Sequence, residues 1–437
     1  TIRVEVMKIG SETFLSKVIQ MVENAQTTKV PIQVFADKVV AIFVPFVLLL
    51  ATFTFFIWTI FPSQMKQLAQ SFSSLLPWMN LDLSPMGMAI YATIAVLVIA
   101  CPCALGLATP TALMVGTGLG AENGILIRDG AAIQRLNEVD TILFDKTGTL
   151  TLGKPTVRKV HPISGIMEND LIRMAASLEK ESTHPLAKSI IKLAEEKEIG
   201  LDPVTEIEVV AGKGISGKYG SAILKVGSGS FTNSETKLSL TGTPVFLSLN
   251  NECIGIFEIE DAIRPDSFET IASLKSAGYK CVLVTGDKKV IADSLSEQLN
   301  IDETHSEVLP DEKATIVKSY QDKGFVVAMV GDGINDAPAI AQADVGIAMG
   351  SGTDVAMETG ELILANADLK SVLRASKLAN ATFSKIKQNL FWAFIYNIVA
   401  IPLAFVGVLH PVIAEVAMAL SSITVVGNSN RLKSIKF

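Results

Sequence analysis

Residues 139–149 read VDTILFDKTGT, and this stretch decides the fold. The short, mostly apolar run at 141–144 ends directly at Asp145 and a polar loop. Two further runs, CVLV at 281–284 and VVAMV at 326–330, are also followed at once by Thr, Gly or Asp. Buried parallel strands have this pattern, because α/β folds bind ligands at polar loops beyond the carboxyl ends of their strands. The sequence therefore predicts an α/β domain built on a parallel sheet.

A second domain is predicted to interrupt the first. About 130 residues separate the first two runs, far more than a single crossover connection needs. We therefore predict an inserted α+β domain over residues 156–253. The parent α/β domain is then divided into residues 109–155 and residues 254–380.

Apolar residues are concentrated towards the two ends of the chain. The 437 residues are 49% hydrophobic and 19% charged, with a mean hydropathy of +0.42, which excludes a disordered protein. Four apolar stretches predict membrane-spanning α-helices, at residues 39–61, 85–107, 390–409 and 412–426. We expect a multidomain membrane protein whose α-helical bundle takes two helices from residues 36–108 and two, with a C-terminal tail, from residues 381–437.

Charge indicates the orientation and the class of partner. The loop between the first two spans carries one basic residue, Lys66, so the positive-inside rule places residues 108–385 in the cytoplasm. A net charge of −7 argues against a nucleic-acid partner, which would require a basic face. Membrane lipid is the expected partner instead.

Residues suited to phosphoryl transfer follow the three predicted strands. Asp145 is predicted to attack a γ-phosphate, with Thr285 and Lys313 compensating charge on the transferred oxygens. The predicted catalytic set is, in chain order, Asp145, Lys146, Thr147, Thr285, Gly286, Asp287, Lys313, Asp332, Asn335 and Asp336. Within this set we expect Mg²⁺ at Asp145, Thr147, Asp332 and Asp336.

The residue two positions after Asp145 separates two reaction outcomes. Phosphatases of the haloacid-dehalogenase class usually place a second aspartate there, as the acid and base of the reaction, whereas this chain has Thr147. Without a local base, a phosphoaspartate persists until another group activates water. This favours a pump intermediate, and a membrane-tethered phosphatase remains the alternative.

The motifs DKTGTLT at 145–151, TGD at 285–287 and GDGINDAP at 331–338 resemble those of the P-type ATPases. The resemblance covers nearly the whole chain. It implies a haloacid-dehalogenase-like phosphorylation domain, an inserted nucleotide-binding domain, and ATP and Mg²⁺ as cofactors.

The predicted insert contains motifs that resemble the heavy-metal subclass. EKESTHPL at 179–186 is similar to its SxHP element, which implies that Glu179 and His184 contact adenine. The same residues also suit the start of a helix, and both readings can hold. Gly212 and Gly214 match the family's glycine pair beside the nucleotide. A later Gly-Asn of the family is Gly-Ser here, at 227–228, which is a departure at that contact.

Cys101, Pro102 and Cys103 lie deep in the second predicted span. On a regular helix the two thiols would point about 200° apart, but Pro102 removes a backbone donor and is expected to unwind the turn. We expect the thiols to remain unbonded, because a disulfide would be strained and a reducing cytosol opposes it. An intramembrane Cys-Pro-Cys resembles the heavy-metal ATPases and implies Cys101 and Cys103 as ligands of a soft metal ion. Packing of two small apolar thiols is the alternative.

The last two predicted spans contain the residues that bear on the choice of metal. Tyr396, Asn397, Met418 and Ser422 match the YN and MxxSS patterns of the copper subclass and imply Cu(I), or the similar Ag(I), as the transported ion. Glu415, one turn before Met418, is predicted to be a release ligand. Packing is the alternative role of Met418, and export of Zn²⁺ or Cd²⁺ is the alternative for the pump.

Residues 1–35 resemble the end of an actuator domain with its linker, so we expect the rest of that domain and earlier membrane helices to lie outside this chain. The tripeptide TGE at 359–361 matches the actuator loop only by coincidence in this interpretation. The sequence as a whole predicts ATP-driven Cu(I) export in a multi-pass protein of a bacterial inner membrane. Its copper donor would be a chaperone or an N-terminal metal-binding domain. A metal-binding scaffold with a decayed catalytic domain is the non-enzyme alternative.

Overall fold

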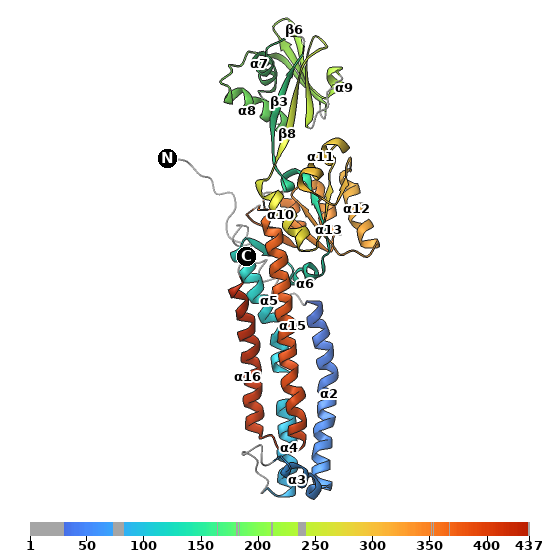
Figure 1. The fold of residues 1–437 in the computed structure, drawn as a ribbon, viewed down its shortest axis with the longest axis vertical. Helices are drawn as coiled ribbons and strands as arrows, with labels where there is room; N and C mark the ends of the chain where they lie inside the picture. The colour runs from blue at the N-terminus through green and yellow to red at the C-terminus, as the bar shows by residue number, and fades with distance from the viewer. Residues whose placement is uncertain are drawn as a thin grey trace, which may run out of the picture. The chain divides into compact units, whose positions relative to one another are not determined.

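The chain divides into two compact units (Figure 1). One contains Thr1–Val139, Glu361–Ala365 and Ser371–Phe437, and the other contains Asp140–Gly360 and Asn366–Lys370. The computed structural model describes residues 30–72, 83–163, 165–180, 182, 184–210, 213–234, 242–350, 352, 354–366 and 368–435.

Four helical segments of the described chain are long and apolar enough to cross a membrane, in agreement with the four predicted spans. All four are longer than predicted. In the first and third, charged residues such as Lys38 and Lys385 end the apolar run without ending the helix. The segments are α2 (Pro31–Ile60), α4 with α5 (Pro85–Ile99 and Cys103–Glu122), α15 (Lys370–Phe405) and α16 (Pro411–Asn430).

Small side chains mediate the contacts between these helices. Helix α4 packs against α2 and α16, and α16 also packs against α5 (Figure 1). Ala95, Ala400 and Ala414 share one buried cluster there. Gly116 of α5 lies so close to α15 that a Cβ at this position would be 2.6 Å from the Thr382 Oγ1. Such residues allow helix backbones to approach closely without a large hydrophobic driving force.

The membrane unit also contains short elements. Helix α3 (Pro62–Gln70) follows α2, and α6 (Gly130–Glu138) is capped by Asp129. Strand β1 (Ile125–Ile127) pairs antiparallel with β13 (Leu362–Leu364). Arg135 of α6 donates to Asp129 at 3.1 Å and to Glu361 at 2.6 Å. The glutamate of the TGE tripeptide is therefore part of a structural ion pair.

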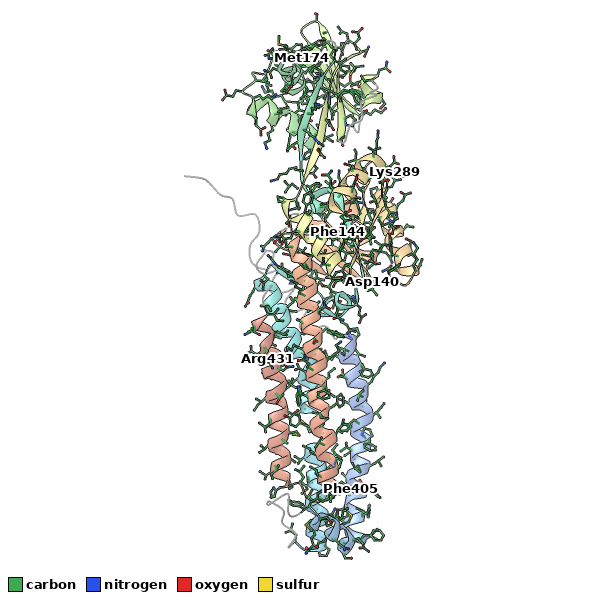
Figure 2. The ribbon with its side chains drawn as sticks, viewed as in Figure 1. Asp140, Phe144, Met174, Lys289, Phe405 and Arg431 are labelled. Carbon is green, nitrogen blue, oxygen red and sulfur yellow. A yellow bond between two sulfur atoms is a disulfide. The ribbon has the colours of Figure 1, made fainter. Side chains whose placement is uncertain are left out.

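The parent domain of the second unit has the predicted parallel sheet. Phe144, labelled in Figure 2, is fully buried in the middle strand β2. The parallel strands run in the order β12 (Val345–Met349), β11 (Val327–Gly331), β2 (Thr141–Asp145), β9 (Lys280–Val284) and β10 (Glu303–His305). The helices of this domain are α10 (Pro265–Ser276), α11 (Lys289–Leu299), α12 (Pro310–Asp322), α13 (Ala337–Gln342) and α14 (Asp354–Thr359).

The inserted domain is an antiparallel sheet with two main helices, which confirms the α+β prediction. Met174, labelled in Figure 2, lies on α7 within its buried core. The strands run in the order β3 (Thr151–Pro162), β8 (Glu252–Ile263), β7 (Thr243–Leu249), β6 (Ala222–Gly227), β5 (Gly214–Tyr219) and β4 (Thr205–Val210). The helices are α7 (Glu168–Glu179), α8 (Pro185–Glu196) and the short α9 (Gly229–Thr232).

Candidate active site

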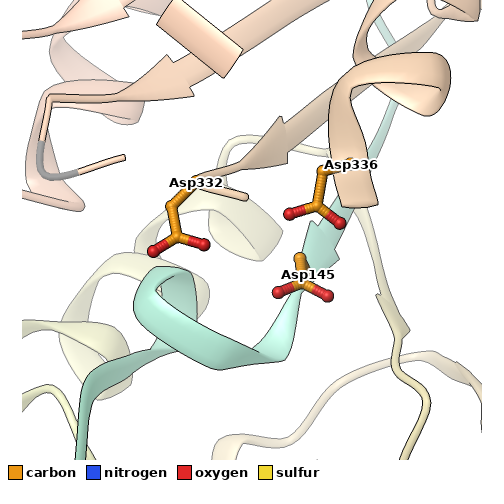
Figure 3. A group of neighbouring side chains, drawn as sticks. All are labelled: Asp145, Asp332 and Asp336. Carbon is orange, nitrogen blue, oxygen red and sulfur yellow. The ribbon is translucent and has the colours of Figure 1, made fainter. Parts of the chain in front are cut away.

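Three aspartates meet at the carboxyl ends of neighbouring strands (Figure 3). Asp145 is the last residue of β2, Asp332 follows β11, and Asp336 immediately precedes α13. Because β2 and β11 pair in parallel, with Phe144 opposite Val330, their ends lie side by side. One carboxylate oxygen from each aspartate lies within 4.8 Å of the other two.

Lys313 of α12 joins two of these carboxylates. Its Nζ donates to Asp145 Oδ1 and to Asp336 Oδ1, each at 2.6 Å. The lysine and Asp145 are both only 6% exposed. Burial disfavours the charged lysine, but the carboxylates of Asp145 and Asp336 outweigh it and raise the pKa of Lys313. The lysine therefore remains an ammonium ion inside the site.

The aspartates carry an excess of negative charge. Burial raises the pKa of Asp145 to about 7; the charge of Asp336 adds to this shift and Lys313 opposes it. Burial, followed by the charge of Asp336, raises the pKa of Asp332 to about 6. Clustered oxygen donors with surplus charge suit a hard divalent cation, so these residues fit Mg²⁺. Thr147, predicted as a fourth ligand, is exposed in the turn after Asp145.

The loop that follows Asp145 is held by two residues that sequence reasoning did not assign to the site. Arg264 donates from Nη2 to the Gly148 carbonyl at 2.7 Å and from Nε to the Thr151 carbonyl at 2.9 Å. Asp261 accepts from the Thr151 hydroxyl at 2.5 Å. Gly148 has a φ of +74°, and a Cβ there would collide with the Asp332 carboxylate. The sequence signal was an acid and an Arg-Pro pair at the end of the strand that returns to the parent domain.

The residues after β9 complete the phosphoryl-transfer set. Thr285 is 2% exposed, and its Oγ1 accepts from the Asp287 backbone N–H at 3.2 Å. The Asp287 carboxylate pairs with the ammonium of Lys146. Gly286 and Asn335 are exposed. Strand ends thus bring the predicted residues to one edge of the sheet, with Lys146 neutralised by Asp287.

The inserted domain contains a separate cavity of about 520 Å³. Glu179 and Ser182 line it from the end of α7 and the loop beyond, and His184 lines it from the N-cap of α8. The other side is formed by residues of β5, β6 and β7, including Gly214, and by Ser228, which follows β6. The cavity therefore gathers three of the four predicted nucleotide residues. The fourth, Gly212, lies outside the described residues.

Two paired glycines on neighbouring strands form part of the cavity wall. Gly214 of β5 pairs with Gly227 of β6. A Cβ on Gly214 would strike the Val226 carbonyl, and one on Gly227 would strike the Lys213 carbonyl. Glycine is required at both positions because two backbones meet there, which gives the predicted Gly214 a definite structural role.

The Cys-Pro-Cys segment interrupts the second membrane span. Helix α4 ends at Ile99 and α5 begins at Cys103, with Pro102 as the residue before α5. The structure contains a disulfide between Cys101 and Cys103, whose Cα atoms are 5.4 Å apart. The expectation of unbonded thiols is therefore wrong for this structure. The break at Pro102 turns the two side chains towards each other, and their Cα separation lies within the ordinary range for disulfides. In this structure the two sulfurs are bonded to each other and are not free ligands. Reduction of the disulfide would make them available.

Comparison with known proteins places these features in a family. Residues 139–344 match the haloacid dehalogenase-like hydrolases. Copper-transporting ATPase 1 of Rhizobium meliloti is 42% identical over 98% of this chain and 52% of that protein, and the silver exporting P-type ATPase of Salmonella typhimurium is 40% identical over the same shares. The structure of a zinc-transporting PIB-type ATPase in its E2.Pi state matches with a TM-score of 0.76 and 31% identity, over 98% of this chain and 68% of that one.

The chain belongs to the heavy-metal P-type ATPases. It spans about half the length of the curated relatives it matches, 52% of the Rhizobium protein for example. Those relatives are named for copper and silver, and the solved structure is named for zinc. Membership of this ATPase family therefore leaves the ion to be argued from the chain's own residues.

The last two helices of this P-type ATPase show which predicted metal residues face inwards. Asn397 of α15 is 8% exposed, and Ser421 of α16 is 3% exposed with a buried hydroxyl that has no hydrogen-bond partner among the described residues. Tyr396, Met418 and Ser422 are half-buried. Glu415 is exposed, so the described helices do not enclose it. The buried face of α16 thus includes the MxxSS segment but does not extend to Glu415.

Proposed function

We propose that this protein uses ATP to drive Cu(I), or the chemically similar Ag(I), across a membrane through a phosphoaspartate on Asp145. The observation that carries the proposal is the buried Lys313, which bonds Asp145 and Asp336 at 2.6 Å each beside Asp332. A nucleophilic carboxylate, a fixed ammonium and further oxygen ligands are the groups needed to transfer a phosphoryl group to an acid. Thr147 in place of a second acid favours a persistent intermediate over immediate hydrolysis.

The proposed transfer of the phosphoryl group forms one bond and breaks one bond. A carboxylate oxygen of Asp145 bonds to the γ-phosphorus of ATP while the bond from that phosphorus to the β–γ bridging oxygen breaks, and ADP leaves with that oxygen. Lys313, which bonds Asp145, and the Thr285 hydroxyl, which follows the neighbouring strand β9, would offset charge on the transferred oxygens. Mg²⁺ bound by Asp145 and Asp332 would neutralise phosphate charge and favour the ionised nucleophile.

Lys146 has a proposed part in admitting the phosphates. Its ammonium pairs with Asp287 at the same sheet edge. A nucleotide phosphate offers the lysine a second anionic partner, so binding of ATP would compete with Asp287 for Lys146. The Asp145 loop stays fixed meanwhile, because Arg264 holds the Gly148 carbonyl.

The choice of metal rests on ligand chemistry in the membrane unit. Reduced Cys101 and Cys103 would supply thiolates, and Met418 a thioether, which suit a soft monovalent ion. Asn397 of α15 adds a buried amide. The last two spans contain Tyr396, Asn397 and Met418, which resemble the pattern of the copper subclass, and this resemblance supports Cu(I) over the Zn²⁺ alternative.

The direction and surroundings of transport are part of the same proposal. The positive-inside rule supports a cytoplasmic location for the catalytic domains, in the inner membrane of a bacterium, with export as the direction. A copper chaperone or an N-terminal metal-binding domain would deliver the ion, and Glu415 would assist its release.

The test is incorporation of label from γ-labelled ATP in the presence of Cu(I), Ag(I) or Zn²⁺. Acid-stable label that requires Cu(I) or Ag(I) and is lost in Asp145→Asn is the expected result. Asp293→Asn, an exposed aspartate on α11, is the matched control and should label normally. Label driven by Zn²⁺ alone would overturn the choice of metal. Release of phosphate from small esters with no label would favour the phosphatase instead.

A further inference from the structure

Glu179 is a buried acid in the cavity of the inserted domain. It is the last residue of α7, is only 8% exposed, and lines the cavity beside Ser182. The Ser182 side chain is its hydrogen-bond partner. In the described chain, no lysine, arginine or histidine forms an ion pair with it. A carboxylate in such a place has little to stabilise its charge.

Three features of the surroundings favour the neutral acid. Carbonyl groups at the end of α7 carry partial negative charge, which disfavours an anion there. The cavity walls near the acid are largely apolar, with Leu186, Val226 and Val245 among them. Burial raises the pKa of Glu179 to about 7, and the Ser182 hydrogen bond opposes this only in part. The acid is therefore protonated below neutral pH and loses its proton above it.

Among the described residues, the other titratable groups that line the cavity are His184 and Lys213. His184 contributes from the N-cap of α8, where its Nδ1 accepts from the Leu186 N–H at 3.2 Å. Lys213 contributes from the residue before β5 and is exposed. The lining residues of β6 and β7 contribute no charge. The protonation state of Glu179 thus depends mainly on its burial.

A protonated carboxyl group and a carboxylate form complementary hydrogen bonds with different purine bases. The acid has one donor and one acceptor side by side, and adenine presents an amine donor beside a ring-nitrogen acceptor. A carboxylate has only acceptors. It can accept a hydrogen bond from the adenine amine, but its second oxygen and the ring nitrogen are both acceptors and repel each other. Guanine presents two adjacent N–H donors on its Watson–Crick edge, which match a carboxylate. The proton on the acid therefore sets which base is preferred.

Building on the proposed nucleotide role of this domain, we propose that Glu179 recognises adenine in its neutral form, donating to a ring nitrogen while accepting from the amine. ATP is then preferred over GTP at and below neutral pH, and this preference falls as the pH rises. The cavity acts as a selector for adenine because it holds a single uncharged acid.

The test compares the wild-type protein with Glu179→Gln by calorimetric titration of ATP and GTP at about pH 6 and about pH 8.5. Glutamine offers the same donor and acceptor as the protonated acid and does not titrate. Wild-type affinity for ATP should fall on the order of tenfold between the two pH values, whereas the variant should hold its low-pH affinity within about twofold. The ATP phosphates titrate equally in both experiments, so the ratio of the two proteins' affinities isolates Glu179.

Glu168→Gln, at the other end of α7 and exposed, is the matched control and should titrate like the wild type. Weak ATP binding by Glu179→Gln at both pH values, with an undiminished wild type at about pH 8.5, would show that the carboxylate is the working form and overturn the proposal. Absence of ATP binding by the wild type at either pH would instead overturn the nucleotide site itself, and this proposal with it.

Discussion

Lys313 and Asp145 are buried as deeply as many apolar residues around them, yet both are charged groups of the same site. Such a pair is costly unless each charge is fully partnered. Here the ammonium has two carboxylate partners, so the loss of the lysine would leave three acids facing one another.

Replacing Lys313 with Met retains most of the side-chain length and removes the charge. Phosphoenzyme formation should fall by about two to three orders of magnitude, because the transferred oxygens would lose the ammonium ion and keep only the uncharged Thr285 hydroxyl and any bound Mg²⁺ to offset their charge. Rapid-quench labelling with ATP measures this rate. Lys318→Met, on the same helix with a side chain 63% exposed, should label at the wild-type rate. Normal labelling of Lys313→Met would remove the lysine from the mechanism.

Asp145 also affects stability, with a sign that follows from its pKa. Folding raises that pKa from 3.8 to about 7, so the stability present below about pH 4 is lost as the pH rises towards 7. Asp145→Asn cannot ionise. Without divalent cations, the free energy of unfolding of the variant should therefore exceed that of the wild type by about 1–3 kcal/mol above neutral pH, and its melting temperature should be higher. The two melting temperatures should converge near pH 4.

Thermal unfolding at several pH values measures that difference, and added Mg²⁺ should shrink it by stabilising the ionised aspartate. The exposed Asp293→Asn should show no such trend. A variant less stable than the wild type at every pH would mean that the carboxylate contributes favourably even when unmetallated.

At the scale of elements, α5 and α15 are held together by a contact that tolerates no added atom. A methyl group on Gly116 would meet Thr382, whereas a methyl group on Gly118 would meet nothing within 4 Å. Gly116→Ala should lower the melting temperature of the detergent-solubilised protein by several degrees, because the helices must separate. Gly118→Ala should leave it unchanged or slightly higher, since alanine favours helix. Equal effects of the two variants would refute the close contact.

Elements with a strong local signal were predictable from the sequence. The apolar runs at 141–144, 281–284 and 326–330 became β2, β9 and β11, because a short buried run followed by a polar loop has few other solutions in an α/β domain. The lengths of α2 and α15 were not predictable from hydropathy, since a helix continues beyond the apolar residues that cross the membrane. The disulfide was missed because it depends on the local path of the chain at Pro102.

The candidate site was predictable to the extent that its residues have a proposed role towards phosphate or metal. Asp145 and Asp332 were recognisable as acids at strand ends, and Lys313 as a lysine on the helix before β11, because phosphoryl transfer to an acid requires those side chains. Arg264 and Asp261 bond the Thr151 side chain and backbone atoms of the loop, so the acid and the Arg-Pro pair in the sequence did not by themselves indicate a part in the site.

At the scale of the whole molecule, a substitution in the membrane unit and one in the catalytic unit should abolish different properties, metal binding in one and phosphorylation in the other. Cys103→Ser removes one proposed soft ligand from the membrane unit, so metal-stimulated labelling of the reduced protein should be lost while ATP affinity is retained. Asp145→Asn should show the reverse, losing label but keeping metal binding. Calorimetry and labelling on the same preparations measure both. Cys253→Ser, in the inserted domain, should retain both properties, and loss of ATP binding in Cys103→Ser would contradict the separation.

The insert enters the parent domain through β3 and leaves through β8, and Thr151 lies opposite Ile263 in their pairing. The order in which the protein folds follows from these adjacent ends. Strands β2 and β9 are neighbours in the sheet although the whole insert separates them in the chain, and closing so long a loop is entropically costly. Once the insert has folded, its ends are only a strand spacing apart, and the same closure becomes short. The inserted domain should therefore fold first, and the parent domain should assemble around its two adjacent ends.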